Sequence, residues 1–501
     1  MALQPHKAVL HFLALQGIST GQLDLRNALE GRCAGQISQM AIKFGTSGWR
    51  AVIADEFTFA NVRRVTEAIC RYLKSEPGSG GTLIIGHDTR FMGEAFSDVA
   101  AKLIESKGMK VLRCTHPVPT PTVAHAIRAL KTDGAMNFTA SHNPPEYQGI
   151  KFSTPDGAPA LPEVTGKIEA QLIVTSPVAE EEGGSIEDFD PRPGYLDDLA
   201  TKINFDAIEK AGGKFVYDPL WGTGRGYLNK ALADRGVSVE TLHDWRDVTF
   251  GGQAPEPGKD HLGDLFTAVK DAGAVLGLAT DGDSDRFGVI AHDGTFIEPN
   301  ELIALLTDYL VETRGWKLGV ARSVATSHLV DRVAKARDIK VFETPVGFKY
   351  IGELINKDEI ILGGEESAGL TIRGHYPEKD GILACLLAVE AVAVRQTPLV
   401  EQLKELWGRV GRLYSGRIGI RLDDEVAAKL KEKLAEDPTE FAGRKVQSTD
   451  RIDGVQFRFE NDSWILLRPS GTEPVVRIYA ESESSDDVNK LLEEGKKYLL
   501  G

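Results

Sequence analysis

Cysteine, long apolar runs and a surplus of positive charge are scarce or missing in this sequence. Its 501 residues include four cysteines, far apart and without a Cys-x-x-Cys pair. This excludes a disulfide framework and a zinc site built on such pairs, and it is typical of a reducing compartment. The longest apolar stretch runs from Ile382 to Val394 and is interrupted by Glu390, so it favours a buried helix over a membrane span. We therefore expect a cytoplasmic protein with no membrane partner.

The formal net charge is −15 at pH 7. Such a chain is repelled by nucleic acids and by anionic membranes, so neither is an expected partner. A small anionic substrate is not excluded, because salt limits charge effects to about 8 Å and the cationic groups near a site then dominate. The sequence leaves open whether the protein is a monomer or a homodimer.

A chain of this length is too long for one hydrophobic core, so three or four domains are expected. Residues 8–15 resemble a weak signal-peptide core, but His11 and the lack of a small-residue cleavage site argue against export. Strand and helix patterns become dense only after Met40. We therefore expect either that translation naturally starts at Met40, or that residues 1–39 are a dispensable, disordered extension.

A strand–helix–strand pattern occurs three times after residue 40, beginning at the apolar strands 82–86, 214–218 and 319–321. Alternating strands and helices predict mostly parallel sheets covered by helices. The last part of the chain differs, with a charged helix over 424–435 followed by two strands around 468–474, which predicts a smaller α+β domain. The expected division is 40–185, 186–293, 294–408 and 409–501, with an acidic, glycine-containing linker at 180–184.

Ser141 begins the most informative stretch, Ser-His-Asn-Pro-Pro-Glu-Tyr, directly after the apolar run 135–138. A serine at the carboxyl end of a buried strand, followed by an Asn-Pro-Pro turn, is where α/β enzymes place reactive groups. Alone, the stretch is equally a surface turn with an incidental Ser-His pair, or the nucleophile of a hydrolase. Three further loops favour a serine that carries a phosphoryl group.

The first of these loops has aspartates at three alternate positions, Asp281, Asp283 and Asp285. Carboxylates this close repel one another unless they share a cation, so the spacing indicates a hard divalent ion. An EF-hand is excluded, because Arg286 and His292 occupy its required glycine and glutamate positions. Three protein ligands leave room for a phosphate oxygen, which favours Mg²⁺ over a merely solvated acidic turn.

The other two loops supply polar groups for a sugar phosphate. Glu365 and Ser367 follow two glycines, and in an extended chain they would point to one side and bind neighbouring sugar hydroxyls. The turn at 468–474, followed by Arg477, offers hydroxyls, backbone N–H groups and two arginines to an anion. A plain glycine-rich turn and a β-turn with incidental arginines are the alternatives.

Five segments together resemble the α-D-phosphohexomutases, in that family's order: 44–50, 139–152, 281–286, 364–369 and 468–472. The resemblance implies an α/β protein with three related mixed α/β domains around a central cleft, plus a smaller α+β C-terminal domain. Segments 344–349 and 378–381 resemble phosphoglucomutases, and Glu366 stands where phosphoglucosamine mutases usually have Gln. Gln148 departs from the Asn of many relatives, with little chemical consequence.

The resemblance also implies roles for individual residues. Ser141 would be the phosphoserine, and its phosphate would ligate Mg²⁺ together with Asp281, Asp283 and Asp285. The substrate's own phosphate would bind Arg468, Ser470, Gly471, Thr472 and Arg477, and its hydroxyls would bind Glu365 and Ser367. Catalysis would also use Lys151 for the hydroxyl proton, which requires a lowered pKa, with His142 in support and with Arg50 and Arg286 steadying phosphate charge; Lys349 and His375 would line the cleft.

The expected activity is that of a phosphoglucomutase, which interconverts glucose 1-phosphate and glucose 6-phosphate with glucose 1,6-bisphosphate as activator and intermediate. A phosphomannomutase or a dual-specificity enzyme is the alternative, because no motif decides the configuration at O2. A phosphatase that hydrolyses its phosphoserine and a non-catalytic relative are further alternatives. The second is disfavoured because a scaffold needs neither the serine nor the aspartates. We also expect the last domain to close over the substrate.

Overall fold

The computed structural model describes residues 42–45, 48–76, 78, 81–174, 178–421, 424–470 and 475–500. The chain divides into two compact units, Met1–Ile42 and Lys43–Gly501, and the description below concerns the second. The expected extension 1–39 and six residues of the predicted segments lie outside the described residues: Thr46, Ser47, Gly471, Thr472, Glu473 and Pro474.

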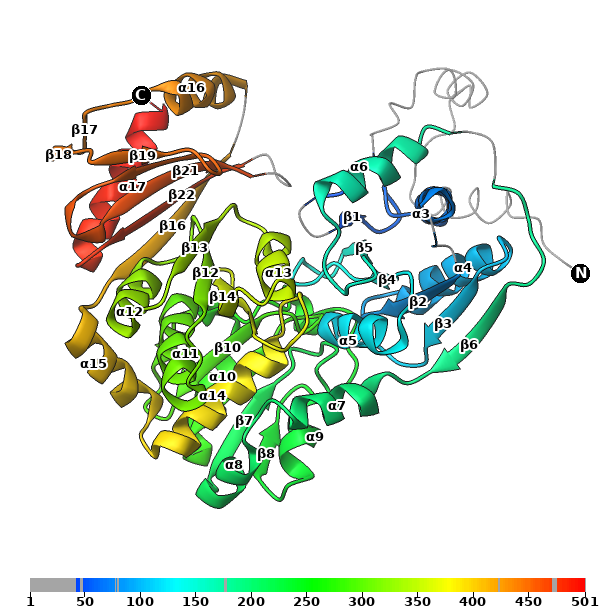
Figure 1. Ribbon diagram of the computed structural model, residues 1–501, viewed down its shortest axis with the longest axis horizontal. Helices are drawn as coiled ribbons and strands as arrows, with labels where there is room; N and C mark the ends of the chain where they lie inside the picture. Colours follow the sequence, from blue (N-terminus) through cyan, green and yellow to red (C-terminus); the bar gives the residue numbers. More distant parts are fainter. Residues whose placement is uncertain are drawn as a thin grey trace, which may run out of the picture. The chain divides into compact units, whose positions relative to one another are not determined.

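The first sheet has six strands in the order β1-β5-β4-β2-β3-β6 (Figure 1). The inner pairs are parallel, whereas β5 runs antiparallel to both β4 and β1. In α4 the apolar spacing buries Phe96, Ala100 and Ile104, as the amphipathic pattern predicts. The strands are β1 (Trp49–Val52), β2 (Thr82–His87), β3 (Lys110–Cys114), β4 (Ala135–Phe138), β5 (Tyr147–Ser153) and β6 (Ser185–Phe189), and the helices are α3 (Phe59–Ser75), α4 (Gly93–Glu105), α5 (Thr120–Leu130) and α6 (Pro162–Gln171).

The second sheet has the order β11-β10-β9-β7-β8. Strands β9 and β10 form an antiparallel hairpin whose connection is the predicted aspartate loop, with Thr280 opposite Phe287. All residues of both strands are buried, which holds the loop at a fixed place at the sheet end. The strands are β7 (Lys214–Asp218), β8 (Ser238–Thr241), β9 (Leu276–Thr280), β10 (Phe287–Ala291) and β11 (Phe296–Ile297), and the helices are α7 (Arg192–Ala200), α8 (Phe205–Ala211), α9 (Leu228–Ala233) and α10 (Gly263–Ala272).

The third sheet has the order β13-β12-β14-β15, with β15 antiparallel to β14 and the others parallel. Most of α14 is buried, and it packs on β9, β10 and β15, which confirms the prediction of a buried helix there. The strands are β12 (Gly319–Ser323), β13 (Val341–Thr344), β14 (Ile360–Glu365) and β15 (Gly369–Ile372), and the helices are α11 (Pro299–Arg314), α12 (Leu329–Arg337), α13 (Phe348–Asn356), α14 (Gly381–Arg395) and α15 (Leu399–Val410).

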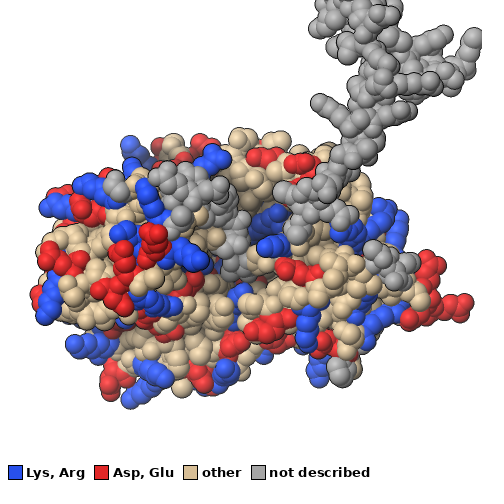
Figure 2. All heavy atoms as spheres, turned by 90° about the horizontal axis from the view of Figure 1, so that it is seen from above, with Lys and Arg blue, Asp and Glu red and all other residues tan. Residues whose placement is uncertain are grey.

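Within the part of the chain that the structure describes, no single helix is long and apolar enough to span a membrane. Helices α14 and α15 pass such a test only together, by length and composition, and the pair is bent by 81° where it breaks. Acidic and basic side chains are interspersed over the face drawn in Figure 2.

The fourth sheet is antiparallel throughout, in the order β16-β22-β21-β20-β19. It has more strands than the two expected, because short alternating segments before 468 also join it. Together with the three mixed sheets it confirms the predicted fold class. The elements are β16 (Tyr414–Arg421), α16 (Asp424–Ala435), the small pair β17 (Glu440–Phe441) and β18 (Arg444–Lys445), β19 (Ser448–Asp450), β20 (Val455–Arg458), β21 (Trp464–Pro469), β22 (Val475–Ser482) and α17 (Ser485–Leu500), which packs on β16 and β22.

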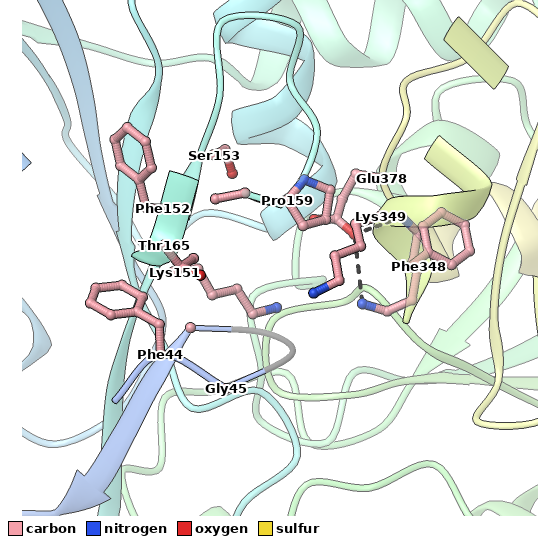
Figure 3. A pocket seen from close by; sticks show the side chains of 13 residues that line it. Phe44, Gly45, Lys151, Phe152, Ser153, Pro159, Thr165, Phe348, Lys349 and Glu378 are labelled. Atoms are coloured by element: carbon pink, nitrogen blue, oxygen red, sulfur yellow. Dashed lines mark hydrogen bonds and ion pairs between the residues drawn. The ribbon is translucent and has the colours of Figure 1, made fainter. Parts of the chain in front are cut away.

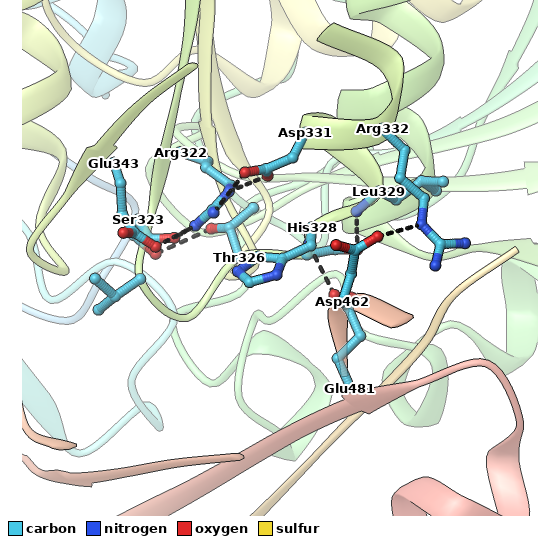
Figure 4. A network of polar contacts seen from close by, with 12 residues as sticks. Arg322, Ser323, Thr326, His328, Leu329, Asp331, Arg332, Glu343, Asp462 and Glu481 are labelled. Carbon is cyan, nitrogen blue, oxygen red and sulfur yellow. Dashed lines mark hydrogen bonds and ion pairs between the residues drawn. The ribbon is translucent and has the colours of Figure 1, made fainter. Parts of the chain in front are cut away.

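A polar network joins the third and fourth sheets (Figure 4). The buried guanidinium of Arg322 on β12 donates to Asp331 and to Glu343. Glu343 also accepts from Arg458 of β20, at 2.7 Å. Because Glu343 accepts from both Arg322 of the third sheet and Arg458 of the fourth, these charge-assisted hydrogen bonds tie the two sheets together. The expected closure of the last domain over a substrate stays a prediction.

Candidate active site

Ser141 lies where β4 ends and the chain turns sharply. Its backbone has φ +51°, in the left-handed region, and its N–H donates to Thr139 Oγ1 at 2.9 Å. The residue is buried, and its hydroxyl donates to Asp281 Oδ2 at 2.7 Å. The structure therefore brings the predicted phosphoserine and the predicted metal loop into direct contact.

Arg90, which the sequence analysis did not single out, holds this serine loop in place. Its buried guanidinium donates to Asp88 and to four main-chain oxygens, those of Ser141, Asn143, Pro144 and Tyr147, at 2.6–3.0 Å. Five donors in a planar fork are what such a set of acceptors requires, and lysine could not replace them. Its position just after β2, at the same sheet edge as Ser141, was the signal available in the sequence.

The three aspartates of the 281–286 loop converge, with carboxylate oxygens within 4.8 Å of one another, and all three are buried. Asp283 Oδ2 accepts from Thr120 Oγ1 at 2.5 Å, and Asp281 Oδ1 accepts from the N–H of Arg286 at 3.0 Å. Buried carboxylates this close form a concentrated negative centre.

The chemistry of this cluster fits a divalent cation. Asp283 Oδ1 and Asp285 Oδ1 are buried and have no hydrogen-bond partner among the described residues. Burial and the two neighbouring carboxylates raise the pKa of Asp281 well above its usual range. A hard cation among these oxygens would satisfy the unpaired acceptors and remove the repulsion. Mg²⁺ is such an ion, and Asp281, Asp283 and Asp285 are the residues that could hold it.

Lys151 is in contact with the cluster rather than with the serine. Its ammonium donates to Asp283 Oδ2 at 2.5 Å and to Asp285 Oδ2 at 2.7 Å. Burial lowers the pKa of Lys151, but the carboxylates of Asp283 and Asp285 outweigh burial, and the pKa lies above its usual range. The lowered pKa that a proton-accepting lysine requires is therefore not present, because two anions surround this amine.

Lys379 is a second ammonium at the cluster, and its contribution was missed. It donates to Asp285 Oδ2 at 2.8 Å and lies 3.6 Å from Glu378 Oε1. Burial lowers the pKa of Lys379, whereas Asp285 and Glu378 raise it, and the net shift is upward. The cluster thus has two fixed cations beside it.

His142 and Arg50 lie on either side of the serine loop. The His142 Nδ1 atom is 3.4 Å from Ser141 Oγ, a long contact. Burial, followed by the charges of Arg286 and Arg50, holds the pKa of His142 well below its usual range, so the ring is neutral near pH 7. Arg50 donates to Asn143 Oδ1 at 2.6 Å. Both residues are placed close to a group carried by Ser141.

The predicted sugar-binding residues lie in the β14–β15 hairpin. The chain turns at 366–368, so the extended alternation expected for Glu365 and Ser367 does not continue past Glu365. Glu365 accepts from the N–H of Gly347 at 2.7 Å, and burial and the neighbouring Glu366 raise its pKa to about 7. Ser367 lines a cavity of about 350 Å³, together with Arg286, Glu366 and Arg417.

The predicted phosphate-binding arginines face one another across two strands. Arg468 of β21 and Arg477 of β22 are cross-strand partners, an arrangement of like charges that is unfavourable unless anions compensate it. Arg468 Nε donates to Asp453 Oδ2 at 2.7 Å, and the N–H of Ser470 donates to the carbonyl of Val475 at 2.8 Å. Two guanidinium groups so placed form a positively charged patch that would attract an anion.

Lys349 and His375 have different surroundings. Lys349 lines a small cavity with Lys151 and Glu378, and Figure 3 shows the side chains of Lys151 and Lys349 pointing toward one another. Burial lowers the pKa of Lys349. His375 is buried, bonds Asp380 Oδ2 at 2.8 Å and lines neither of these cavities. Asp380 also accepts from Tyr195 at 2.7 Å, and the expectation that His375 lines the cleft stays a prediction.

Family models for phosphoglucomutase/phosphomannomutase match along the chain, with alpha/beta/alpha domain I at residues 41–176, domain II at 193–294, domain III at 298–410 and the C-terminal domain at 425–496. The chain belongs to this family. It is therefore a phosphohexomutase, an isomerase-class enzyme of the α-D-phosphohexomutase superfamily. The division at residues 185, 293 and 408 stays a prediction.

Curated phosphohexomutases resemble the chain over nearly its whole length. It is 30% identical to a phosphoglucomutase/phosphomannomutase from Thermococcus kodakarensis, over 91% of this chain and 98% of that protein. It is 32% identical to a probable phosphoglucosamine mutase from Methanobrevibacter smithii, with 91% and 98% covered. A putative phosphomannomutase structure from Thermus thermophilus has a TM-score of 0.82 at 35% identity, covering 92% and 99%. These names differ in substrate, so the hexose is not fixed by similarity.

A more distant fold neighbour has been solved with ligands. N-acetylphosphoglucosamine mutase from Aspergillus fumigatus is 14% identical, with a TM-score of 0.57 over 96% of this chain and 100% of that one, and was crystallised with GlcNAc-6P and magnesium. Another structure of that protein, with a TM-score of 0.55 over 95% and 99%, contains glucose 1,6-bisphosphate. This likeness shows a shared fold.

Proposed function

We propose that this phosphohexomutase is a phosphoglucomutase that works through a phosphoserine at Ser141 and a glucose 1,6-bisphosphate intermediate. The observation that carries the proposal is the 2.7 Å contact between Ser141 Oγ and Asp281, one of three clustered, buried aspartates. A phosphoryl group on that oxygen would lie beside a cation held by the aspartates, as phosphoryl transfer requires. Magnesium and glucose 1,6-bisphosphate in distant relatives are consistent with both ligands.

The reaction consists of two phosphoryl transfers, first from Ser141 to the sugar and then from the sugar to Ser141. The bond between phosphorus and Ser141 Oγ breaks as a bond to O6 of glucose 1-phosphate forms, and the O6 proton ends on Ser141 Oγ. After the bisphosphate turns in the site, the bond between phosphorus and O1 breaks as a bond to Ser141 Oγ forms, the Oγ proton ends on O1, and glucose 6-phosphate is released. When bound, Mg²⁺ would neutralise charge on the transferring group. Lys151 and Lys379 are both cationic, and their hydrogen bonds to Asp285 keep its carboxylate in position to bind the ion.

The remaining site residues position the sugar phosphate. We assign the non-reacting phosphate to Arg468, Arg477 and the turn at Ser470, because two facing arginines attract a dianion. Glu365 and Ser367 are assigned to the sugar hydroxyls, and Arg50, His142 and Arg286 to the phosphoryl group near Ser141. Lys349 and His375 stay predicted residues of the cleft. A cytoplasmic location and a monomeric or homodimeric state remain predictions from the sequence.

Our choice of glucose over glucosamine rests on the resemblance at Glu366, where phosphoglucosamine mutases usually have Gln; Glu366 accepts from Ser323 and Thr326 and lines the larger cavity beside Ser367. A phosphomannomutase is the second candidate, because the Thermus thermophilus structure that resembles the chain over 92% of its length is a putative phosphomannomutase.

A coupled assay tests the proposal. Glucose 1-phosphate, mannose 1-phosphate and glucosamine 1-phosphate are compared with Mg²⁺, each with and without a glucose 1,6-bisphosphate primer. We expect the highest kcat/KM with glucose 1-phosphate and stimulation by the primer. A preference for mannose 1-phosphate would establish the second candidate. Release of inorganic phosphate at a rate independent of the primer would indicate a phosphatase, and no turnover of any substrate would indicate a non-catalytic relative.

A further inference from the structure

A second polar cavity lies outside the predicted catalytic residues. It has a volume of about 300 Å³, and its lining includes His116 and Pro117 after β3, Arg192 of α7 and Arg225 in the glycine-rich segment after β7. None of the residues assigned above to the serine, the metal, the sugar or its phosphate lines it. Its function is therefore not explained by the proposed reaction.

The lining is rich in hydrogen-bond donors that have no anionic partner. Among the described residues, no carboxylate lies within ion-pair distance of Arg192 or Arg225, whereas the partly buried Arg314 and Arg337 each have an ion pair. Arg192 Nε is buried without a partner, and Arg225 uses its Nε on the carbonyl of Gly222. Among the described residues that line the cavity, Asp244 is the one acidic side chain; it is exposed, and its charge acts on Arg225 from beyond ion-pair distance.

Other donors complete the set. The side-chain carbonyl oxygen of Asn229 accepts from the N–H of Gly226 at 2.9 Å. The NH₂ group of Asn229 therefore points away from Gly226. His116 is exposed at the cavity. Two guanidinium groups, an amide and an imidazole around one space form a site for a tetrahedral dianion.

The same two segments that line the cavity also hold the aspartate loop. Thr223 lines the cavity, and its N–H donates to the carbonyl of Gly282 at 3.0 Å while its hydroxyl lies 3.0 Å from Ser284 Oγ. Three residues after Pro117, the N–H of Thr120 donates to the carbonyl of Asp283 at 2.9 Å. An anion that fixed the two segments would fix the loop as well.

We propose that this cavity binds a phosphate group, as inorganic phosphate or as a phosphate monoester, and that its occupancy strengthens metal binding at the aspartates. The anion bridges the 116–120 and 222–226 segments, so the aspartate loop loses less freedom when the cation binds. Coupling of this kind is reciprocal: Mg²⁺ then strengthens phosphate binding by the same factor. The inference does not depend on which hexose the enzyme uses.

Calorimetric titration with inorganic phosphate tests the site. All proteins carry Arg468→Ala, which weakens phosphate binding at the proposed active site. In that background we expect Arg225→Gln, and separately Arg192→Gln, to weaken phosphate binding about tenfold, the loss typical of a charge-assisted contact. Lys230→Gln is the matched control, since Lys230 lies on the neighbouring helix α9 and pairs with Asp234 outside the cavity.

The outcomes are distinct. Equal phosphate affinity in the background protein and in both glutamine variants, or no phosphate binding in the background protein, overturns the site. Weakening by Lys230→Gln equal to that by the cavity variants also overturns it, because the effect would be general electrostatics. Glucose 6-phosphate replaces inorganic phosphate in a parallel series, and the tighter ligand identifies the source. If phosphate leaves the Mg²⁺ affinity of the background protein unchanged, the proposed coupling is wrong.

Two separate variants are used so that misfolding of one does not prevent the test. Arg192 packs over the ring of Tyr227, with 5.0 Å between guanidinium carbon and ring centroid, whereas Arg225 has no such contact. If one variant fails to fold, the other still decides the site, and a thermal unfolding curve identifies which one is informative.

Discussion

The hydroxyl of Ser141 donates to a carboxylate oxygen of Asp281 at 2.7 Å, although 140 positions separate the two residues in sequence. The contact joins the first sheet to the hairpin of the second. It places the proposed phosphoryl acceptor beside the proposed metal, so the reaction centre lies at the junction of two domains rather than within one.

Ser141→Ala tests whether Ser141 carries the phosphoryl group. We expect turnover to fall at least about a thousandfold, because no other group takes the phosphoryl, and we expect no protein-bound phosphate after incubation with glucose 1,6-bisphosphate, as measured by intact mass. Ser106→Ala is the control, because the hydroxyl of Ser106 donates to the carbonyl of Leu103 at the end of helix α4, outside the serine loop. Normal phosphate incorporation in Ser141→Ala would place the carrier elsewhere.

Asp283→Asn tests the metal cluster. We expect roughly a hundredfold or greater loss of kcat and a higher Mg²⁺ concentration for half-maximal activity, because one anionic ligand is removed. Asp271→Asn, an exposed aspartate on α10, should leave both unchanged. Assays across Mg²⁺ concentrations separate the two effects, and an unchanged metal dependence would argue against Asp283 as a ligand.

Arg90→Lys tests the positioning of the serine loop. A lysine keeps the charge but cannot serve four carbonyls, so we expect kcat to fall roughly a hundredfold with a small change in KM. Arg90→Met should also destabilise the fold by about 3–5 kcal/mol, because it leaves the buried Asp88 without its ion pair. Arg246→Lys is the control, since Arg246 is exposed and contacts the carbonyl of Thr89. Wild-type kcat in Arg90→Lys would contradict a positioning role.

Glu365 predicts a pH dependence, because burial raises its pKa to about 7. Below that pH the carboxyl is protonated, so binding of sugar hydroxyls should strengthen as pH rises through about 7. Stability moves the opposite way: the folded state holds this proton between about pH 4.5 and 7 while the unfolded state does not, so unfolding free energy falls as pH rises through that window.

The Glu365→Gln variant isolates both effects. In wild type, KM should fall as pH rises through about 7, and the unfolding free energy should decline between about pH 4.5 and 7. Neither change should occur in Glu365→Gln. KM measured from pH 6 to 8.5 in wild type and variant, together with denaturant unfolding, gives the comparison. Parallel profiles in the two proteins would show that another group titrates.

Arg468→Ala tests the phosphate contact of the last domain. We expect KM for glucose 1-phosphate to rise roughly tenfold to a hundredfold with a smaller change in kcat, because a charge-assisted contact to a non-reacting phosphate is lost. Arg451→Ala removes an exposed arginine of the same domain, paired with Asp437, and should leave KM unchanged. A fall in kcat alone would place Arg468 near the transferring group instead.

Local patterns were sufficient to predict much of the fold. The strand 214–218 and the helix 424–435 have the bounds expected from apolar runs and charge, because short-range periodicity decides such elements. The aspartate loop was likewise predictable, since its ligands come from one six-residue stretch. The convergence of Asp281, Asp283 and Asp285 confirms the geometry expected of it.

Side-chain environments set by distant parts of the chain were not predictable. Lys151 lies 132 positions before Asp283, and its raised pKa follows from that contact, which no local pattern contains. Arg90 acts on carbonyls, which every sequence has. Glu365 and Ser367 were placed by strand alternation, but a hairpin turn intervenes at 366–368.

Arg90 holds the main chain of the serine loop and not its side chains, since every loop atom that it hydrogen-bonds is a main-chain oxygen. The loop's geometry is therefore specified from outside the loop. Evolution, or a designer, can change the residues around Ser141 to suit a different sugar while the curvature that presents the serine persists. Substrate preference and carrier geometry become separable traits in this scaffold.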